Sequence, residues 1–226
     1  MKTSKKFKET FSALLLIFTA LAGLTSCSSD SEISGNAYVR IVNSSESAPP
    51  QDFYLDSSKV NSSAVVYGQN TGYITTTSGN RKARFKTAGT ATVNSSSNIN
   101  INVGNHYTVY YTGGNSSSAN FTTEDDVVAP AAGKAKVRFV HLSSAAASNV
   151  DLAIQGGLKI VSNLAYKTAS AYQEVDAASS FQLFASGSST AALTLSNLSL
   201  QAGKIYTIYF SGSTTATITY HVMVDN

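Results

Sequence analysis

The 226-residue sequence lacks several features that commonly stabilise or activate a protein. It has one cysteine, no tryptophan, three histidines and three prolines. A single cysteine excludes an internal disulfide. Neither Gly-x-Ser-x-Gly nor His-Glu-x-x-His occurs, so two patterns that mark serine hydrolases and zinc proteases are missing. Charged residues make up only 13%, yet 12 tyrosines and 10 phenylalanines supply apolar surface that disordered chains lack.

The first 27 residues follow the order of a bacterial secretion signal. Four early lysines precede an apolar run over residues 11–24, and the run ends in Leu24-Thr25-Ser26-Cys27. It is shorter than the roughly 20 apolar residues of a membrane-spanning helix. The last four residues resemble the lipobox of lipoproteins. This resemblance implies that residues 1–26 are cleaved and that Cys27 carries lipid, including palmitate-type chains, as a membrane anchor. A plain secretory signal with an incidental cysteine is the alternative.

Cleavage before Cys27 changes the net charge. The full sequence has 16 basic and 13 acidic residues. The signal contains four lysines and Glu9, so 12 basic and 12 acidic side chains remain. A neutral protein has no basic field to attract phosphates. We therefore expect no nucleic-acid partner.

The rest of the chain is a tandem repeat. The stretch Gly104-Asn105-His106-Tyr107-Thr108-Val109-Tyr110-Tyr111-Thr112-Gly113 returns as Gly203-Lys204-Ile205-Tyr206-Thr207-Ile208-Tyr209-Phe210-Ser211-Gly212. We expect a lipidated tether at 27–36, repeat one at 37–126, a linker at 127–133 and repeat two at 134–226. Further matches pair Arg40 with Arg138, Tyr67 with Tyr166, Tyr73 with Tyr172, Phe85 with Phe184, and Asp126 with Asp225.

Alternating apolar and polar residues predict strands. Tyr107, Val109 and Tyr111 alternate with Thr108 and Tyr110, which is the period of a strand with one buried face. Gly156-Gly157 predicts a hairpin turn. About seven short strands per repeat, including 181–185, 191–195 and 204–211, indicate an all-β fold of two tandem immunoglobulin-like β-sandwich domains.

The order of these motifs resembles a known family. Val39-Arg40-Ile41-Val42 near the start, Tyr67-Gly68 and Tyr73 in the middle, and Gly104-x-x-Tyr107-Thr108-Val109-Tyr110 near the end are similar to domain of unknown function 4397, DUF4397. That family occurs in tandem in secreted proteins and lipoproteins of Bacteroidetes type. The resemblance implies an outer-membrane lipoprotein, facing the surface or the periplasm. It implies no activity, substrate or catalytic residue. Repeat two lacks glycines at the positions of Gly68 and Gly72.

One strand carries a row of cations. Alternation places Lys82, Arg84 and Lys86 on one face of a strand and Phe85 on the other. This row is a candidate ligand surface for phosphates or an acidic glycan. A charged outer face that protects a sheet edge from aggregation is the alternative. By the sequence match, repeat two has Phe181, Leu183 and Ala185 there.

Two pairs of equivalent residues are further candidates. Tyr110 and Tyr209 point away from the predicted core and are a candidate aromatic ligand platform, or they only cover the sheet. Arg40 and Arg138 recur at equivalent positions, and we expect structural ion pairs. Their expected partners are an acid of the same repeat: Asp52 or Asp126 for Arg40, and Asp151 or Asp225 for Arg138.

No residue set predicts a metal, a cofactor or catalysis. Glu124-Asp125-Asp126 with Asp52 or Asp56 lacks the spacing that would fix six calcium ligands, and a solvated strand end explains these acids. A hydrolase would require a cleft that brings His141 or His221 to a carboxylate. We expect a lipid-anchored, non-enzymatic envelope protein that serves as a binding, adhesion or scaffold module for an extracellular polymer or an envelope protein. A glycan-binding accessory lipoprotein of nutrient uptake is the first alternative, and a hydrolase the second.

Overall fold

A computed structural model describes residues 34–113, 119–146 and 148–226. The expected signal sequence, Cys27 and most of the tether lie outside these described residues. The described part of the chain contains strands and no helix, as an all-β fold requires. Accordingly, no helix in it is long and apolar enough to cross a membrane.

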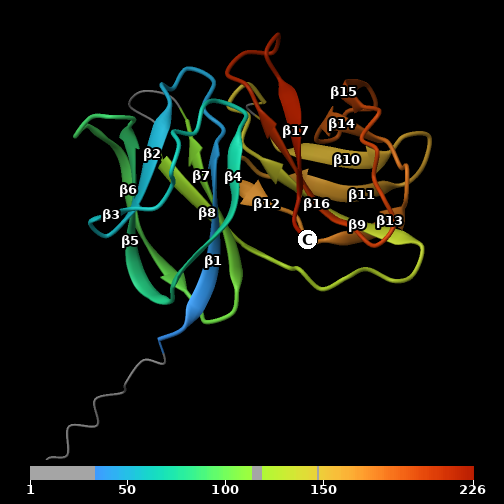
Figure 1. Ribbon diagram of the computed structural model, residues 1–226. Helices are drawn as coiled ribbons and strands as arrows, with labels where there is room; N and C mark the ends of the chain where they lie inside the picture. Colours follow the sequence, from blue (N-terminus) through green and yellow to red (C-terminus); the bar gives the residue numbers. More distant parts are fainter. Residues whose placement is uncertain (1–33, 114–118, 147) are drawn as a thin grey trace, which may run out of the picture. The chain divides into compact units, whose positions relative to one another are not determined.

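The first repeat forms two four-stranded sheets (Figure 1). One sheet has the order β4-β1-β7-β8, with β1 and β7 parallel, and the other has the order β3-β2-β5-β6. The strands are β1 (Asn36–Asn43), β2 (Gln51–Leu55), β3 (Ser58–Lys59), β4 (Asn70–Thr77), β5 (Gly79–Thr87), β6 (Val93–Ile101), β7 (His106–Thr112) and β8 (Ala119–Asp125).

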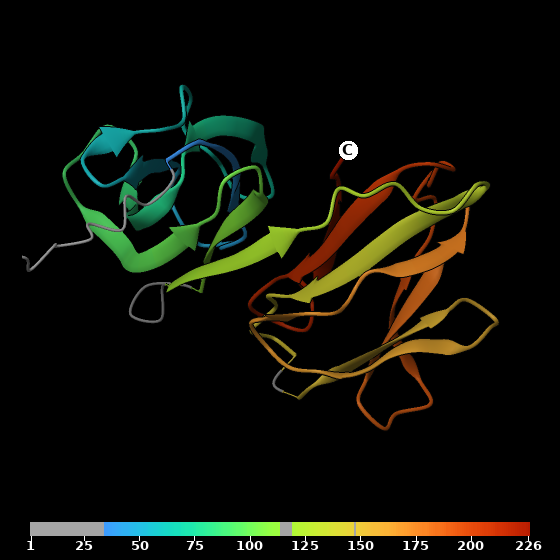
Figure 2. The same ribbon diagram turned by 90° about the horizontal axis from the view of Figure 1, so that it is seen from below.

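The second repeat has the same plan. Figure 2 shows its parallel pair, with β9 in yellow beside β16 in red. One sheet has the order β12-β9-β16-β17, with β13 also paired to β9, and the other has the order β11-β10-β14-β15. The strands are β9 (Lys134–His141), β10 (Val150–Ile154), β11 (Lys159–Leu164), β12 (Thr168–Ala169), β13 (Gln173–Asp176), β14 (Phe181–Ala185), β15 (Ala191–Leu195), β16 (Ile205–Ser211) and β17 (Thr219–Val224).

Each sandwich has its own core, built from the alternation seen in the sequence. Tyr107, Val109 and Tyr111 of β7 pack into the first core, and Tyr206, Ile208 and Phe210 of β16 into the second. The ring centroids of Phe53 and Phe85 lie 4.9 Å apart. Because these side chains face inward from both sheets, the fold is a sandwich in each repeat, as predicted.

Local signals gave most strands correctly. The predicted segments 181–185 and 191–195 are β14 and β15 as observed, and Gly156, with φ of 71°, lies in the turn between β10 and β11. The two-residue strand β12 was not predicted. Lys167 has φ of 58° where Gly68 has 78°, so a lysine adopts the left-handed conformation that the first repeat gives to glycine.

Two sequence matches are wrong by one position. Asp52 pairs with Lys86 across β2 and β5, while its equivalent Asp151 pairs with Phe184. Phe85 therefore corresponds to Leu183, not Phe184. Similarly, Asp125, not Asp126, takes the place of Asp225, as the ion pairs described next show. One residue fewer separates Tyr172 from Leu183 than separates Tyr73 from Phe85, and a constant sequence offset cannot follow such a deletion.

Candidate functional site

A buried ion pair joins the first repeat to the second. Arg40 on β1 is 1% exposed. Its Nη2 donates to Oδ1 of Asp225 at 2.7 Å, and its Nη1 donates to the carbonyl of Val224 at 3.0 Å. Within its own repeat, Arg40 donates from Nε to Oγ1 of Thr108 at 3.1 Å and lies 4.6 Å from the ring centroid of Tyr73.

Arg138 of the second repeat makes the equivalent contacts to the first repeat. Arg138 on β9 is 3% exposed. Its Nη2 donates to Oδ1 of Asp125, and its Nη1 donates to the carbonyl of Glu124 at 2.9 Å. Its Nε donates to Oγ1 of Thr207 at 2.9 Å, and its guanidinium lies 4.8 Å from the ring centroid of Tyr172. The two repeats thus contact each other through equivalent residues on both sides.

Each acceptor carboxylate is held by its own repeat. The hydroxyl of Tyr73 donates to Oδ2 of Asp125 at 2.6 Å, and Thr108 Oγ1 donates to the same oxygen. The hydroxyl of Tyr172 donates to Oδ2 of Asp225 at 2.9 Å. These fixed partners offset the cost of burying charge, which is otherwise several kcal/mol per ion.

The surrounding charges shift the pKa values in the direction that holds this network together. Burial lowers the pKa of Arg40, but Asp225, Tyr73 and Asp125 together more than compensate, and the net pKa lies above its ordinary value. Burial, together with the nearby Asp125 carboxylate, raises the pKa of Tyr73 far above its usual range. Arg40 therefore stays charged and the Tyr73 hydroxyl stays a donor.

The expected acid partners of the two arginines are wrong, although Arg40 Nη2 also lies 3.6 Å from Oδ2 of Asp125 in its own repeat. The other three expected acids each bind a lysine: Asp52 binds Lys59 at 2.7 Å, Asp151 binds Lys159 at 2.6 Å, and Asp126 binds Lys136 at 2.9 Å. Asp225 does bind an arginine, but it is Arg40. Asp125, which the sequence comparison passed over, is the acceptor for Arg138. An ion pair was predicted, but not that it crosses between repeats.

The candidate platform of Tyr110 and Tyr209 does not lie at the surface. Both residues are buried, at 0% and 1% exposure, and their ring centroids lie 5.8 Å apart with the rings nearly perpendicular. They belong to a third apolar cluster, with Val42, Val140, Leu142 and Met223. Burial raises the pKa of Tyr110 to about 12. The outer faces of β7 and β16 are covered by the opposite repeat, so these rings cannot receive a sugar.

A chain of hydroxyls and a histidine adds to this contact. The hydroxyl of Tyr67 lies 2.7 Å from Ser211 Oγ, and Ser211 Oγ lies 2.9 Å from Nε2 of His221. The His221 ring stacks on Tyr209 with centroids 4.6 Å apart. A nucleophile must be reachable by substrate, but Ser211 is 0% exposed. The arrangement supports docking of the repeats.

The cation row lies on the outer face of β5. Ala83 and Phe85 are buried and Lys82 is exposed, so the predicted alternation is confirmed. However, β5 pairs with β2 on one side and β6 on the other, so it is not an edge strand and the row cannot serve as edge protection. The equivalent positions of the second repeat are Ser180, Gln182 and Phe184.

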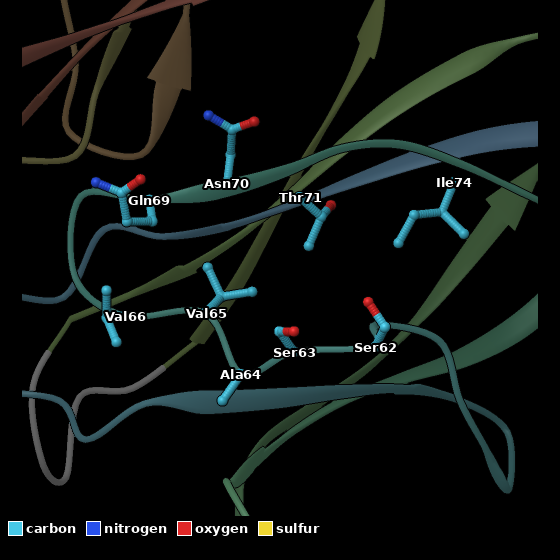
Figure 3. A pocket seen from close by; sticks show the side chains of 9 residues that line it. All are labelled: Ser62, Ser63, Ala64, Val65, Val66, Gln69, Asn70, Thr71 and Ile74. Atoms are coloured by element: carbon cyan, nitrogen blue, oxygen red, sulfur yellow. The ribbon is translucent and has the colours of Figure 1, made fainter.

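The surface cavities contain few residues that could bind a charged ligand or act in catalysis. A cavity of about 300 Å³ between β4 and the loop before it is lined by neutral residues (Figure 3). A wider one of about 510 Å³ includes His106, Asp125 and Tyr172, but Asp125 already belongs to the ion network. Among the described residues, no group of three or more histidine, cysteine, aspartate or glutamate side chains is placed to hold a metal ion.

Fold and junction together define a protein of two tandem β-sandwich repeats that dock through equivalent buried ion pairs. The chain belongs to the family described as domain of unknown function DUF4397, whose model matches residues 37–153 and 144–226. No curated protein matches the sequence. A solved structure, the Bacillus anthracis TIE protein, is 12% identical, with a TM-score of 0.23, over 79% of this chain and 34% of that one. This chain therefore spans about a third of that protein.

Proposed function

We propose that the protein is a non-catalytic binding module of a bacterial envelope, held to the outer membrane by lipid on Cys27. The observation that carries this proposal is the junction. Across the two repeats, the buried Arg40 binds Asp225 and the buried Arg138 binds Asp125, and within the first repeat Arg40 also lies 3.6 Å from Asp125. These charged groups hold the two sandwiches together as one unit. Such a role suits a protein that presents its surface to a partner.

The membrane anchor rests on the sequence. An apolar run before Leu24-Thr25-Ser26-Cys27 favours cleavage and acylation, and several acyl chains give lasting attachment where a single chain is marginal. The stretch 28–36 is polar and can connect the lipid to the first strand, β1, which begins at Asn36.

The anchor is tested by labelling and by protease treatment. Cells that produce the full chain are grown with radioactive palmitate, with Cys27→Ser as the control. We expect label in the wild-type protein alone. Intact cells are then treated with protease, and loss of the band would place the domains outside the cell. Label in both proteins, or wild-type protein in the soluble fraction, would reject the anchor.

A further inference from the structure

The cations of the first repeat gather on one sheet. Residues 37–126 contain six basic and six acidic side chains. One basic residue, Arg40, is buried at the junction. The other five lie on β3 and β5, whereas only two acids lie on or directly beside this sheet, Asp52 on β2 and Asp56 after it. The five cations are Lys59, Arg81, Lys82, Arg84 and Lys86.

Two of the five cations are neutralised by those two acids. Lys59 Nζ lies 2.7 Å from Oδ1 of Asp52, and Arg81 Nε lies 2.6 Å from Oδ2 of Asp56. Within the described part of the chain, Lys82, Arg84 and Lys86 form no ion pair. The sheet therefore carries three net positive charges, although basic and acidic side chains are equal in number over the whole protein after signal cleavage.

Strand β5 places the three unpaired cations in a line, and two of them have a further side-chain contact. Arg84 Nη2 donates to the carbonyl of Asp56, and Lys86 Nζ lies 4.2 Å from the ring centroid of Tyr54. Alternate residues of a strand are about 7 Å apart, so the row extends over about 14 Å. The strand is fixed on both sides by β2 and β6, so the charges are arranged before any ligand arrives.

Neutral polar side chains run beside the cations. On β6, Asn98 lies opposite Lys82, Ser96 lies opposite Arg84, and Asn100 lies opposite Asn80. All three β6 residues are exposed. Residues directly opposite each other on antiparallel strands share a face of the sheet. This face thus offers cations that can bind the acid groups of a ligand. Beside them it offers amides and a hydroxyl that can bind the ligand's neutral hydroxyl groups.

We propose that the outer face of β5 and β6 binds an acidic polysaccharide, through Lys82, Arg84 and Lys86 to its acid groups and through Ser96 and Asn98 to its hydroxyls. The inference rests on the proposed function, because it names the partner of that binding module. A polymer with repeated acid groups can occupy several of these positions at once, which strengthens a set of weak contacts.

Two other polyanions fit this face less well. Single-stranded nucleic acids stack their bases on open aromatic rings, but the one ring here, Tyr54, lies under Lys86. Binding to a lipid surface needs apolar side chains that enter the headgroup region. On β2, β3, β5 and β6, the only large apolar side chain that is more than a third exposed is Val93, at 48%.

The test uses the full chain, purified in detergent, on immobilised polygalacturonate. The double variant Lys82→Gln, Lys86→Gln is compared with Lys167→Gln, Lys204→Gln, which removes the same charge from repeat two and breaks no pair with an aspartate or glutamate side chain. We expect the first variant to weaken binding about tenfold, which corresponds to about 1.4 kcal/mol, and the second to change it less than twofold. Binding should also weaken as salt rises.

Equal weakening in the two double variants, or no binding of the wild-type chain to polygalacturonate, would overturn the proposal. Neutral dextran, a single-stranded oligonucleotide and phosphatidylglycerol vesicles serve as competing probes. A preference for the oligonucleotide or the vesicles over polygalacturonate would also overturn it. These results are independent of the anchor, because failure of Cys27 labelling rejects the lipid attachment and leaves binding by the cation row untouched.

Discussion

Arg40 donates a hydrogen bond at 2.7 Å to Asp225, a residue of the other repeat that is 185 positions away. Neither side chain has access to solvent beyond 1%. The equivalent pair in the opposite direction joins Arg138 to Asp125. Since each repeat supplies one arginine and one aspartate, the junction has the self-complementary character of a symmetric dimer interface, here within one chain.

Asp225→Asn should destabilise the protein strongly. The substitution keeps the shape of the side chain but removes the nearer of the two countercharges of buried Arg40, leaving only Asp125 at 3.6 Å; breaking such a buried pair costs about 3–5 kcal/mol in free energy of unfolding. Urea unfolding followed by fluorescence measures the loss. Asp176→Asn is the matched control, because Asp176 pairs with Lys134 at the surface and is 82% exposed; little change is expected there. Equal effects would contradict a structural role for the buried pair.

Gly68→Ala should disrupt the contact between repeats. A Cβ atom at Gly68 would lie 2.8 Å from Cε1 of His221, and its φ is +78°. Gly72→Ala is the control, because Gly72 has φ of +68° and no atom near its Cβ position. Both variants bear the backbone cost of about 1 kcal/mol, and Gly68→Ala should lose about 1–3 kcal/mol more through the clash. Thermal unfolding of the two variants separates these costs, and equal losses would show that His221 does not occupy this position.

The features of the fold that follow from residue alternation and from turn-forming residues could be predicted from the sequence. The inward set Tyr107, Val109 and Tyr111 followed from a period of two, and the turn at Gly156 from two adjacent glycines. The burial of Tyr110 could not be predicted, because a strand covered on its second face by another domain has the same period as one facing water. The partner of Arg40 was equally hidden. Equivalent arginines and acids occur in both repeats, and nothing in their spacing distinguishes pairing within a repeat from pairing between repeats.

Tyr110→Phe should leave stability unchanged or raise it by up to about 1 kcal/mol. Within the described residues, the buried Tyr110 hydroxyl has no hydrogen-bond partner, and removing such a group relieves the cost of its desolvation. Tyr107→Phe is the matched control. The Tyr107 hydroxyl accepts from the amide of Asn102 at 3.1 Å and donates to Glu124 at 3.2 Å, so its removal should cost about 1 kcal/mol. Chemical denaturation of both variants checks the difference; a loss in Tyr110→Phe as large as in Tyr107→Phe would indicate a partner for Tyr110.

Stability should fall as the pH drops below about 6.5. Burial lowers the pKa of His221 from the ordinary 6.5, and its ring lies against Tyr209 and Tyr67. When the pH passes below 6.5, the unfolded chain takes up a proton at this residue before the folded chain does, so the free energy of unfolding decreases with falling pH. The same direction holds for His106 and His141, whose pKa values are also lowered by burial.

Urea titrations at pH 7.5 and pH 5.5 measure this dependence, with His221→Gln beside the wild-type protein. The glutamine variant removes one titrating group, so its loss of stability between the two pH values should be smaller. Asp52 and Asp151 are nearly silent in this interval, because their pKa values are lowered further from an already acidic value; their contribution is lost only at lower pH. An identical slope in the two proteins would mean that His221 is as accessible to protons in the folded chain as in the unfolded one, and that the contact with Tyr209 does not bury it.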